Sequence, residues 1–380
     1  MKNVLRVTAW DDARCVEPLK AAAKMWWQKK KVELKIQTRP LTAFNDQPLT
    51  ELAETCDVMV IDHPHVPGAA NQAAILPLDS LLDDETLVRL EEDALVNCYQ
   101  SYFVGNHPYA VAADAACHVS AYRPDLLARL NVDRPKTWHD IFSLAEEHPG
   151  SVAVALHHTD AISCLFSLLA GEKAAPSGGE RMFTNQAATV QALDLLSKLA
   201  AIVPDVCWQC TPPQLFTAAN QGETIAYIPF TFGYTRLTQP HEGNWRFGAP
   251  PVGAGSLLGG AGMAVSARST QPEEAATFVA WYVMPDVQTF LTMNGAQPGS
   301  QMVWNTPLAN KAVGHFFSDT LKTLKQAYTR PLSPWWPSVQ KECGQILVAG
   351  LQANDSPVAI ITKMERCYAE HRTLTQEVTV

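Results

Sequence analysis

A chain of 380 residues is too long for one compact core and predicts about two domains. Hydrophobic residues make up 47% and charged residues 18%, a balance that is typical of a globular protein and excludes a disordered one. The net charge of −9 argues against nucleic acid or an anionic membrane as the main partner, because both are bound by clustered cations.

The first 110 residues alternate predicted strands and helices. Residues 4–10 form a first strand, and an amphipathic helix follows with apolar residues at helical spacing: Val16, Leu19, Ala23 and Trp26. Residues 32–37 alternate apolar and polar side chains, which predicts a second strand. Residues 58–61 are β-branched or apolar throughout and predict a buried third strand. Strands separated by helices predict a largely parallel sheet.

The ends of these strands carry polar and aromatic residues. The third strand stops at Asp62-His63-Pro64, because proline cannot continue a central strand. Trp10 and Asp11 stand at the end of the first strand. Since the carboxyl ends of parallel strands meet at one edge, where ligands usually bind, we expect Trp10, Asp11, Asp62 and His63 at a common crevice.

The middle of the chain predicts a second α/β unit over residues 152–256. An extended segment near 109–123 contains Asp114 and leads into this unit, and Thr137 with Asp140 predicts the capping box of a helix. An amphipathic helix covers about 190–203. Residues 224–230 then read as a strand, which ends in a loop rich in aromatic residues and glycine.

The last part of the chain begins with the glycine-entered strand 259–266, followed by a capped helix over 274–284. Together with three further motifs, this strand and helix resemble family 1 extracellular solute-binding proteins, the sugar-capturing components of ABC importers. The motifs are Tyr122-Arg123-Pro124-Asp125-Leu126-Leu127, Asn294-Gly295-Ala296-Gln297-Pro298 and Arg330-Pro331-Leu332-Ser333-Pro334-Trp335-Trp336. The resemblance runs in order over about residues 4–370.

The resemblance implies a two-lobed α/β fold of the type II periplasmic-binding-protein kind, similar to maltose-binding proteins. Each lobe would be discontinuous: 1–111 with 257–305, and 112–256 with 306–380. Crossing strands would join the lobes and form a hinge near 112–114 and 257–260, which would close around a ligand.

The implied ligand is a carbohydrate. Sugars present flat C–H faces that pack on aromatic rings and hydroxyl groups that need charged or amide partners. Aromatic residues, acids and an exposed backbone at predicted strand ends supply such groups, and Arg236 is a further polar partner. The predicted ligand-binding residues are Trp10, Asp11, Asp62, His63, Asp114, Phe230, Tyr234, Gly260, Trp335 and Trp336.

Catalysis has no signature in the sequence. There is no G-x-S-x-G motif, and neighbouring acids such as Asp11 and Asp12 point apart on a strand. We therefore predict a binding protein and not an enzyme. A carbohydrate-active enzyme, or the same fold binding a polyamine or another non-sugar solute, are the alternatives.

No resident metal or cofactor is expected. Cys207 and Cys210 have CxxC spacing, but no second pair stands at zinc-finger distance, so free thiols or a local disulfide are the two interpretations. Paired histidines lack a matching carboxylate and are expected in polar loops: His63 with His65, and His157 with His158.

Location is indicated only indirectly. The first strand begins directly after Met1-Lys2-Asn3, so the sequence predicts either a cytoplasmic protein or a mature form. Nine scattered cysteines suit a reducing compartment. The resemblance instead implies a periplasmic or extracellular protein, a monomer that delivers its ligand to the membrane permease subunits of an ABC transporter.

Overall fold

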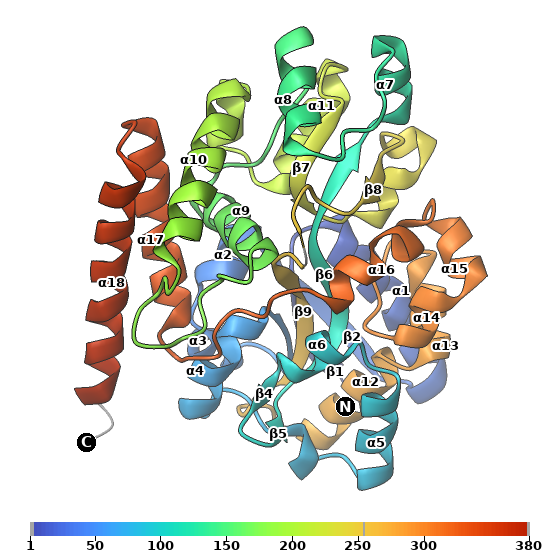
Figure 1. Cartoon of the computed structure of the whole chain (residues 1–380). Helices are drawn as coiled ribbons and strands as arrows, with labels where there is room; N and C mark the ends of the chain where they lie inside the picture. The colour runs from blue at the N-terminus through green and yellow to red at the C-terminus, as the bar shows by residue number, and fades with distance from the viewer. Residues whose placement is uncertain (1–3, 254, 378–380) are drawn as a thin grey trace.

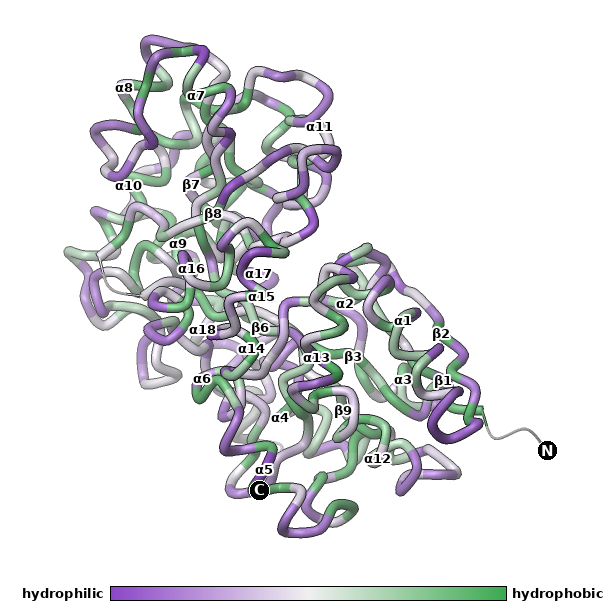
Figure 2. The backbone as a smooth tube through the Cα atoms, turned by 90° about the vertical axis from the view of Figure 1, so that its right-hand side faces the viewer, coloured by the Kyte–Doolittle hydropathy of each residue, from purple (hydrophilic) through white to green (hydrophobic). Residues whose placement is uncertain are grey.

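The computed structural model describes residues 4–253 and 255–377, and it has two lobes (Figure 2). One lobe holds β1 (Val4–Trp10), β2 (Glu33–Arg39) and β3 (Val58–Ile61), which pair in parallel with β1 in the middle. This confirms the three predicted strands and their parallel arrangement. The next strand in the sheet is β9 (Leu258–Val265), which runs antiparallel to β3, so the sheet is mixed.

The long strand β6 (Val111–Tyr122) belongs to both lobes (Figure 1). Its first part pairs with β9, and its last part pairs with β7 (Tyr227–Phe232) and β8 (Arg246–Gly248), all antiparallel. The strand expected at 224–230 thus lies two to three residues later. A break in register between Ala112 and Asp114 interrupts the β6–β9 ladder.

Helices cover the sheets and fill the second lobe. The helices up to β6 are α1 (Ala13–Lys30), α2 (Leu41–Asp46), α3 (Leu49–Ala53), α4 (Val66–Asn71), α5 (Asp84–Glu92) and α6 (Val96–Gln100). A short hairpin lies between α6 and β6, formed by β4 (Phe103–Val104) and β5 (His107–Pro108). The middle helices are α7 (Pro124–Leu130), α8 (Trp138–Glu147), α9 (His158–Gly171), α10 (Gln186–Ile202) and α11 (Pro212–Gly222).

The C-terminal part is helical after β9. Its helices are α12 (Pro272–Tyr282), α13 (Pro285–Thr292), α14 (Gln301–Asn305), α15 (Pro307–Ala312), α16 (Phe316–Lys325), α17 (Trp336–Gln352) and α18 (Pro357–Glu377). Helix α17 packs against α9 and α18, and α10 contacts both α9 and α18. The C-terminal helix pair therefore belongs with helices of the middle segment, at one edge of the molecule in Figure 1.

Local sequence signals explain where several helices begin. Thr137 and Asp140 form the predicted capping box of α8. The Thr137 hydroxyl oxygen accepts a hydrogen bond from the Asp140 backbone N–H, and the Asp140 carboxylate accepts one from the Thr137 backbone N–H. The helix expected at 274–284 begins two residues earlier, because Pro272 occupies its first turn, where its missing N–H costs nothing. The predicted amphipathic helix near 190–203 is α10, which starts at the Asn185 cap.

The buried core consists of two clusters. One lies between the first sheet and helices α1, α12 and α13, where Trp26 packs on Phe278 and Trp281 with ring centroids 5.3 and 4.9 Å apart. The other runs from the opposite face of that sheet through the second lobe. Burial on both faces explains why β3 is apolar along its whole length.

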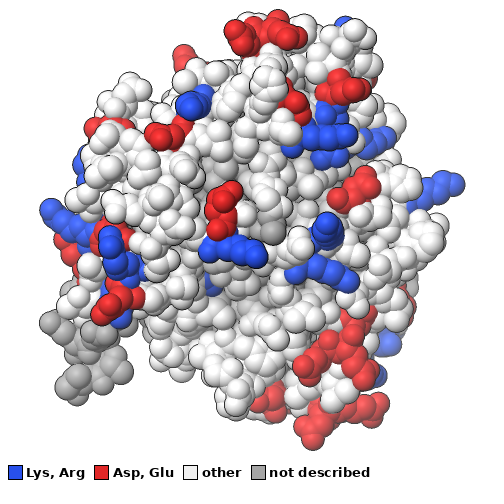
Figure 3. Space-filling model, in the orientation of Figure 1, with Lys and Arg blue, Asp and Glu red and all other residues white. Residues whose placement is uncertain are grey.

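Charged side chains are interspersed on the face drawn in Figure 3, where acidic groups outnumber basic ones at lower right and no broad basic surface is present. This fits the net charge of −9. Within residues 4–253 and 255–377, no helix is both long and apolar enough to cross a membrane.

Candidate functional site

The main pocket lies at the ends of strands from both lobes. Residues at the ends of β1 and β3 line one side, and residues from α9 and the segment after β7 line another. The pocket encloses about 640 Å³, including the part that opens to solvent. Two neighbouring hollows share lining residues with it: one shares Asp62 and Arg330, and the other shares Arg14 and Tyr234. The two hollows therefore adjoin the main pocket, and the three together are called the cleft below.

Aromatic rings form much of the pocket wall. Trp10 ends β1 and packs on Phe44 of α2, with the ring centroids 5.1 Å apart. Phe232 and Tyr234 face the same space from the end of β7 and the loop after it. Flat apolar faces of this kind suit the C–H surface of a sugar ring or another compact, partly apolar solute.

Asp62 lies at the carboxyl end of β3, as predicted, and is held by a buried ion pair. Both of its carboxylate oxygens accept hydrogen bonds from Arg330 Nη2 at 2.9 Å, and one also accepts the His63 backbone N–H. Burial raises the pKa of Asp62, but the Arg330 cation and the hydrogen bond from His63 outweigh it and leave the pKa below its usual value. Asp62 is therefore an anion whose position is fixed by Arg330.

Asp114 forms a second buried ion pair, with Arg14 of α1. Arg14 Nε and Nη2 donate to the two carboxylate oxygens, and Nη1 donates to the Gly233 carbonyl oxygen at 2.8 Å. The guanidinium also lies 5.4 Å from the ring centroid of Tyr234. Arg14 thus connects the first lobe, the crossing strand β6 and the loop after β7.

Asp160 is the third acid of the pocket and differs from the other two. It lies in the first turn of α9 and is only 8% exposed. Its carboxyl group makes no hydrogen bond or ion pair with any other residue that the structure describes. Burial raises the pKa of Asp160 to about 8. Below about pH 8 the carboxyl group therefore keeps its proton, and it offers a ligand in the pocket both an O–H donor and an acceptor oxygen.

Gly260 lines the pocket where β9 crosses the break in β6. Its φ of +99° is accessible to glycine, and a Cβ atom there would lie 2.3 Å from the Asp114 carbonyl oxygen. The predicted role of this backbone as pocket wall agrees with its position, and its conformation explains why glycine stands here.

Five of the ten predicted residues line the main pocket: Trp10, Asp62, Asp114, Tyr234 and Gly260. The other five do not. Asp11 is exposed at the start of the turn before α1, and His63 is fully buried behind Asp62. Burial lowers the pKa of His63 to about 4, with Arg330 contributing, so the imidazole is neutral.

The three remaining aromatic residues pack away from the pocket. Phe230 is a core residue beside His118 and Trp138. Trp336 is fully buried in α17, and Trp335 packs edge-on against Tyr368 of α18. Arg236 lines the adjoining hollow, where it is paired with Glu242.

Sequence reasoning missed Arg14, Arg330 and Asp160. Arg14 follows the strand end at Trp10 by four residues, and Arg330 was noticed only as part of a motif. Their partners lie 100 and 268 residues away in the chain, so no local pattern reveals the pairs. Asp160 resembles an ordinary first-turn acid of a helix, and only its burial distinguishes it.

Of the expected thiol and histidine pairs in the described structure, only His65 lines the cleft, in the hollow that also contains Asp62 and Arg330. Cys207 and Cys210 are free and buried, which supports the interpretation as plain thiols. His157 and His158 stack at 4.1 Å between ring centroids at the start of α9.

The sequence of this chain matches a known family. The profile of the family described as bacterial extracellular solute-binding protein covers residues 21–316, well over half of the chain. The chain belongs to this family. One curated relative is a probable amino-acid ABC transporter periplasmic-binding protein of Sinorhizobium fredii, 26% identical over 43% of this chain. The match spans only 40% of that relative's length.

Solved structures show the fold. The maltose-bound MalE3 protein of T. maritima superposes with a TM-score of 0.85 at 18% identity, over 98% of this chain and 99% of that one. A ribitol-bound ABC transporter solute-binding protein of Agrobacterium radiobacter gives a TM-score of 0.81 at 18% identity, over 97% and 98%. The acarbose-binding GacH receptor of Streptomyces glaucescens gives 0.80 at 19% identity, over 98% of both chains. The predicted two-lobed fold is thereby confirmed.

Proposed function

We propose that this protein captures a small polyhydroxylated solute, a sugar or sugar alcohol, and delivers it to an ABC importer without catalysing a reaction. The observation that carries the proposal is the pocket itself. It combines aromatic faces at Trp10, Phe232 and Tyr234 with the unpartnered carboxyl of Asp160. The sugars and sugar alcohols named for the structural relatives support the same ligand class.

Capture is by closure of the two lobes on the ligand. A ligand can favour the closed arrangement only if it binds that arrangement more tightly than the open one. Contacts from both lobes meet that condition, since Trp10 comes from the first lobe and Asp160 from the second. The Arg14 and Arg330 ion pairs span the same cleft and would stabilise closure further.

The lobes are proposed to comprise 1–111 with 257–305 and 112–256 with 306–380. The pairing of β9 with β3 supports the first assignment, and the packing of α17 on α9 supports the second. The hinge is proposed at the register break between Ala112 and Asp114 and at the neighbouring Gly260. A bulge and a glycine with positive φ are features that let a strand bend.

The proposed partners are the membrane permease subunits of the transporter, and the proposed location is the periplasm or the cell exterior, where the protein would act as a monomer. The family is described as extracellular. The nine cysteines suggested a reducing compartment, but the burial of their thiols is compatible with an oxidising one. All nine are free and buried in the described structure, and buried thiols react slowly with oxidants.

Calorimetric titration against a panel of sugars, sugar alcohols, amino acids and polyamines tests the proposal. We expect saturable binding of at least one sugar or sugar alcohol. At a pH above about 8, where Asp160 is an anion, Asp160→Asn should weaken that binding by about 1.5–3 kcal/mol, the value of a charge-assisted hydrogen bond. Asp205→Asn, at an acid of the same lobe outside the cleft, is the matched control and should bind as the wild type does.

A second ligand class is an amine, such as an amino acid or polyamine. Two observations favour an amine ligand. Asp160 is an unpaired buried acid that could bind an ammonium group, and the curated relative is named for amino-acid transport. In the same titrations, binding of amines with no response to any sugar or sugar alcohol would replace the first proposal with this one.

A further inference from the structure

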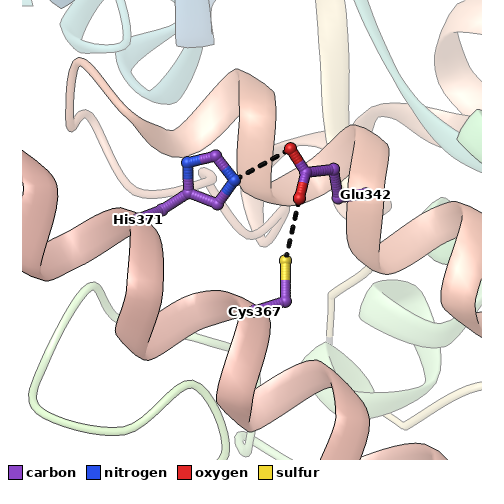
Figure 4. A group of neighbouring side chains, drawn as sticks. All are labelled: Glu342, Cys367 and His371. Atoms are coloured by element: carbon purple, nitrogen blue, oxygen red, sulfur yellow. Dashed lines mark hydrogen bonds and ion pairs between the residues drawn. The ribbon is translucent and has the colours of Figure 1, made fainter.

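Glu342, Cys367 and His371 point toward one another from the C-terminal helix pair (Figure 4). Glu342 comes from α17, and the other two residues lie four positions apart on α18. Residues at this spacing share one face of a helix and lie one turn apart. None of the three lines the cleft, so this cluster, called the helix-pair site below, is separate from the proposed ligand site.

The donor atoms of the helix-pair site are already close together. His371 Nε2 lies 2.9 Å from one Glu342 carboxylate oxygen, and Cys367 Sγ lies 3.6 Å from the other. All three donor atoms lie within 4.8 Å of one another. In a tetrahedral zinc site the corresponding ligand atoms are about 3.3–3.8 Å apart, as follows from zinc–ligand distances near 2.0–2.3 Å. Small side-chain rotations would therefore bring the three donors around one ion.

The three residues of the helix-pair site differ in their exposure to solvent. The Glu342 side chain is 52% exposed and His371 is 21% exposed, whereas Cys367 is buried beneath them. An ion can thus enter from solvent and reach a thiol held in place by the packing of α17 on α18. A fourth position is left for water.

The chemistry of the donors selects the kind of ion. A thiolate and an imidazole are poor ligands for Mg²⁺ and Ca²⁺, which take oxygen donors. Sulfur, nitrogen and a single carboxylate together suit Zn²⁺, and Co²⁺ takes the same sites. We propose that Glu342, Cys367 and His371 bind one Zn²⁺ ion, which links α17 to α18.

Zinc binding should release the thiol proton, since the thiolate is the ligand, and should replace the Glu342–His371 ion pair. The ion then joins two helices that the chain connects only through the short segment 353–356. Because α17 also carries Gln340, which holds Arg330 at the cleft, the metal would steady one wall of the ligand pocket.

Titration of the full-length, reduced protein with Co²⁺, followed by displacement with Zn²⁺, tests the site. We expect one equivalent of Co²⁺ to produce a thiolate-to-cobalt charge-transfer band that Zn²⁺ abolishes. Cys367→Ser should remove the band. Glu342→Gln should weaken binding by more than about tenfold, the loss that even outer-shell partners of a metal can cause.

Glu370→Gln is the matched control, because Glu370 is an exposed acid on α18 beside His371 that pairs with Arg366 instead. It should leave the band and the affinity unchanged. If Cys367→Ser fails to fold, the exposed Glu342→Gln variant still decides. A wild-type protein without the band, a band that survives Cys367→Ser, or an unchanged Co²⁺ affinity in Glu342→Gln would overturn the proposal and leave Glu342 and His371 as a plain ion pair.

Discussion

Single residues of the cleft carry the chemistry, and most of their partners lie far away in sequence. Trp10 and Asp62 were found from the sequence because each ends a strand of a parallel sheet, and strand ends converge on the ligand edge. The same rule failed for Phe230, which comes two residues before the end of β7 and is therefore still inside the core. The rule therefore identifies a ligand-facing residue only when the last residue of the strand is predicted correctly.

Asp160 should make the stability of the ligand-free protein depend on pH. Its pKa is about 8 in the folded protein and near 3.9 in an unfolded chain, so the folded state keeps the proton to higher pH. Its contribution to stability is therefore lost as the pH rises from about 4 to about 8, by at most about 1.4 kcal/mol per pH unit. Urea unfolding of the wild type and Asp160→Asn across this range should give curves that diverge with pH, the variant being the more stable at pH 8. Parallel curves would contradict the predicted pH dependence.

The Asp62–Arg330 pair should behave as a coupled unit. Replacing one member leaves the other charge buried without compensation, which typically costs about 3–5 kcal/mol. Asp62→Asn keeps the acceptor for the His63 N–H, and Arg330→Met keeps the side-chain volume. In denaturant unfolding, each single variant should be strongly destabilised and the double variant by much less than the sum. Additive losses would mean that the pair has no coupling.

At the scale of elements, strands and helices with strong local signals were predicted well, and so was the parallel arrangement of the first three strands, but the strands that pair with β6 were not. The buried run 58–61 is β3 to the residue, and the Thr137 capping box starts α8 as expected. The antiparallel pairing of β6 with β7, β8 and β9 was not anticipated, because register between distant strands depends on tertiary packing. The proposed lobe boundaries remain predictions.

Gly260 should be more sensitive to substitution than other glycines with positive φ. Gly260→Ala would introduce backbone strain, because φ is positive there, and its new Cβ atom would overlap the Asp114 carbonyl oxygen. Gly105 also has positive φ but has open space around it, so Gly105→Ala should cost only about 1–2 kcal/mol. Gly260→Ala should cost roughly 1–3 kcal/mol more, as overpacking does. Thermal or urea unfolding of the two variants compares them directly, and equal losses would show that the crossing of β6 and β9 tolerates a side chain.

At the scale of the whole molecule, the family resemblance predicted the architecture that local patterns could not. Ordered motifs from Tyr122 to Trp336 implied two lobes joined by crossing strands, and the solved structures superpose over nearly the full chain. The identity of the ligand is not predictable in this way. It depends on side chains such as Asp160 and Phe44, which approach the pocket from helices and not from the strand ends.

A crystal structure of the protein with a sugar or sugar alcohol that binds in solution tests the central claim most directly. The account predicts the ligand between the two lobes, with a ring or carbon chain against Trp10 and a hydroxyl group hydrogen-bonded to Asp160. A ligand bound outside the cleft, or inside it without contacts from both lobes, would contradict the proposed capture by closure.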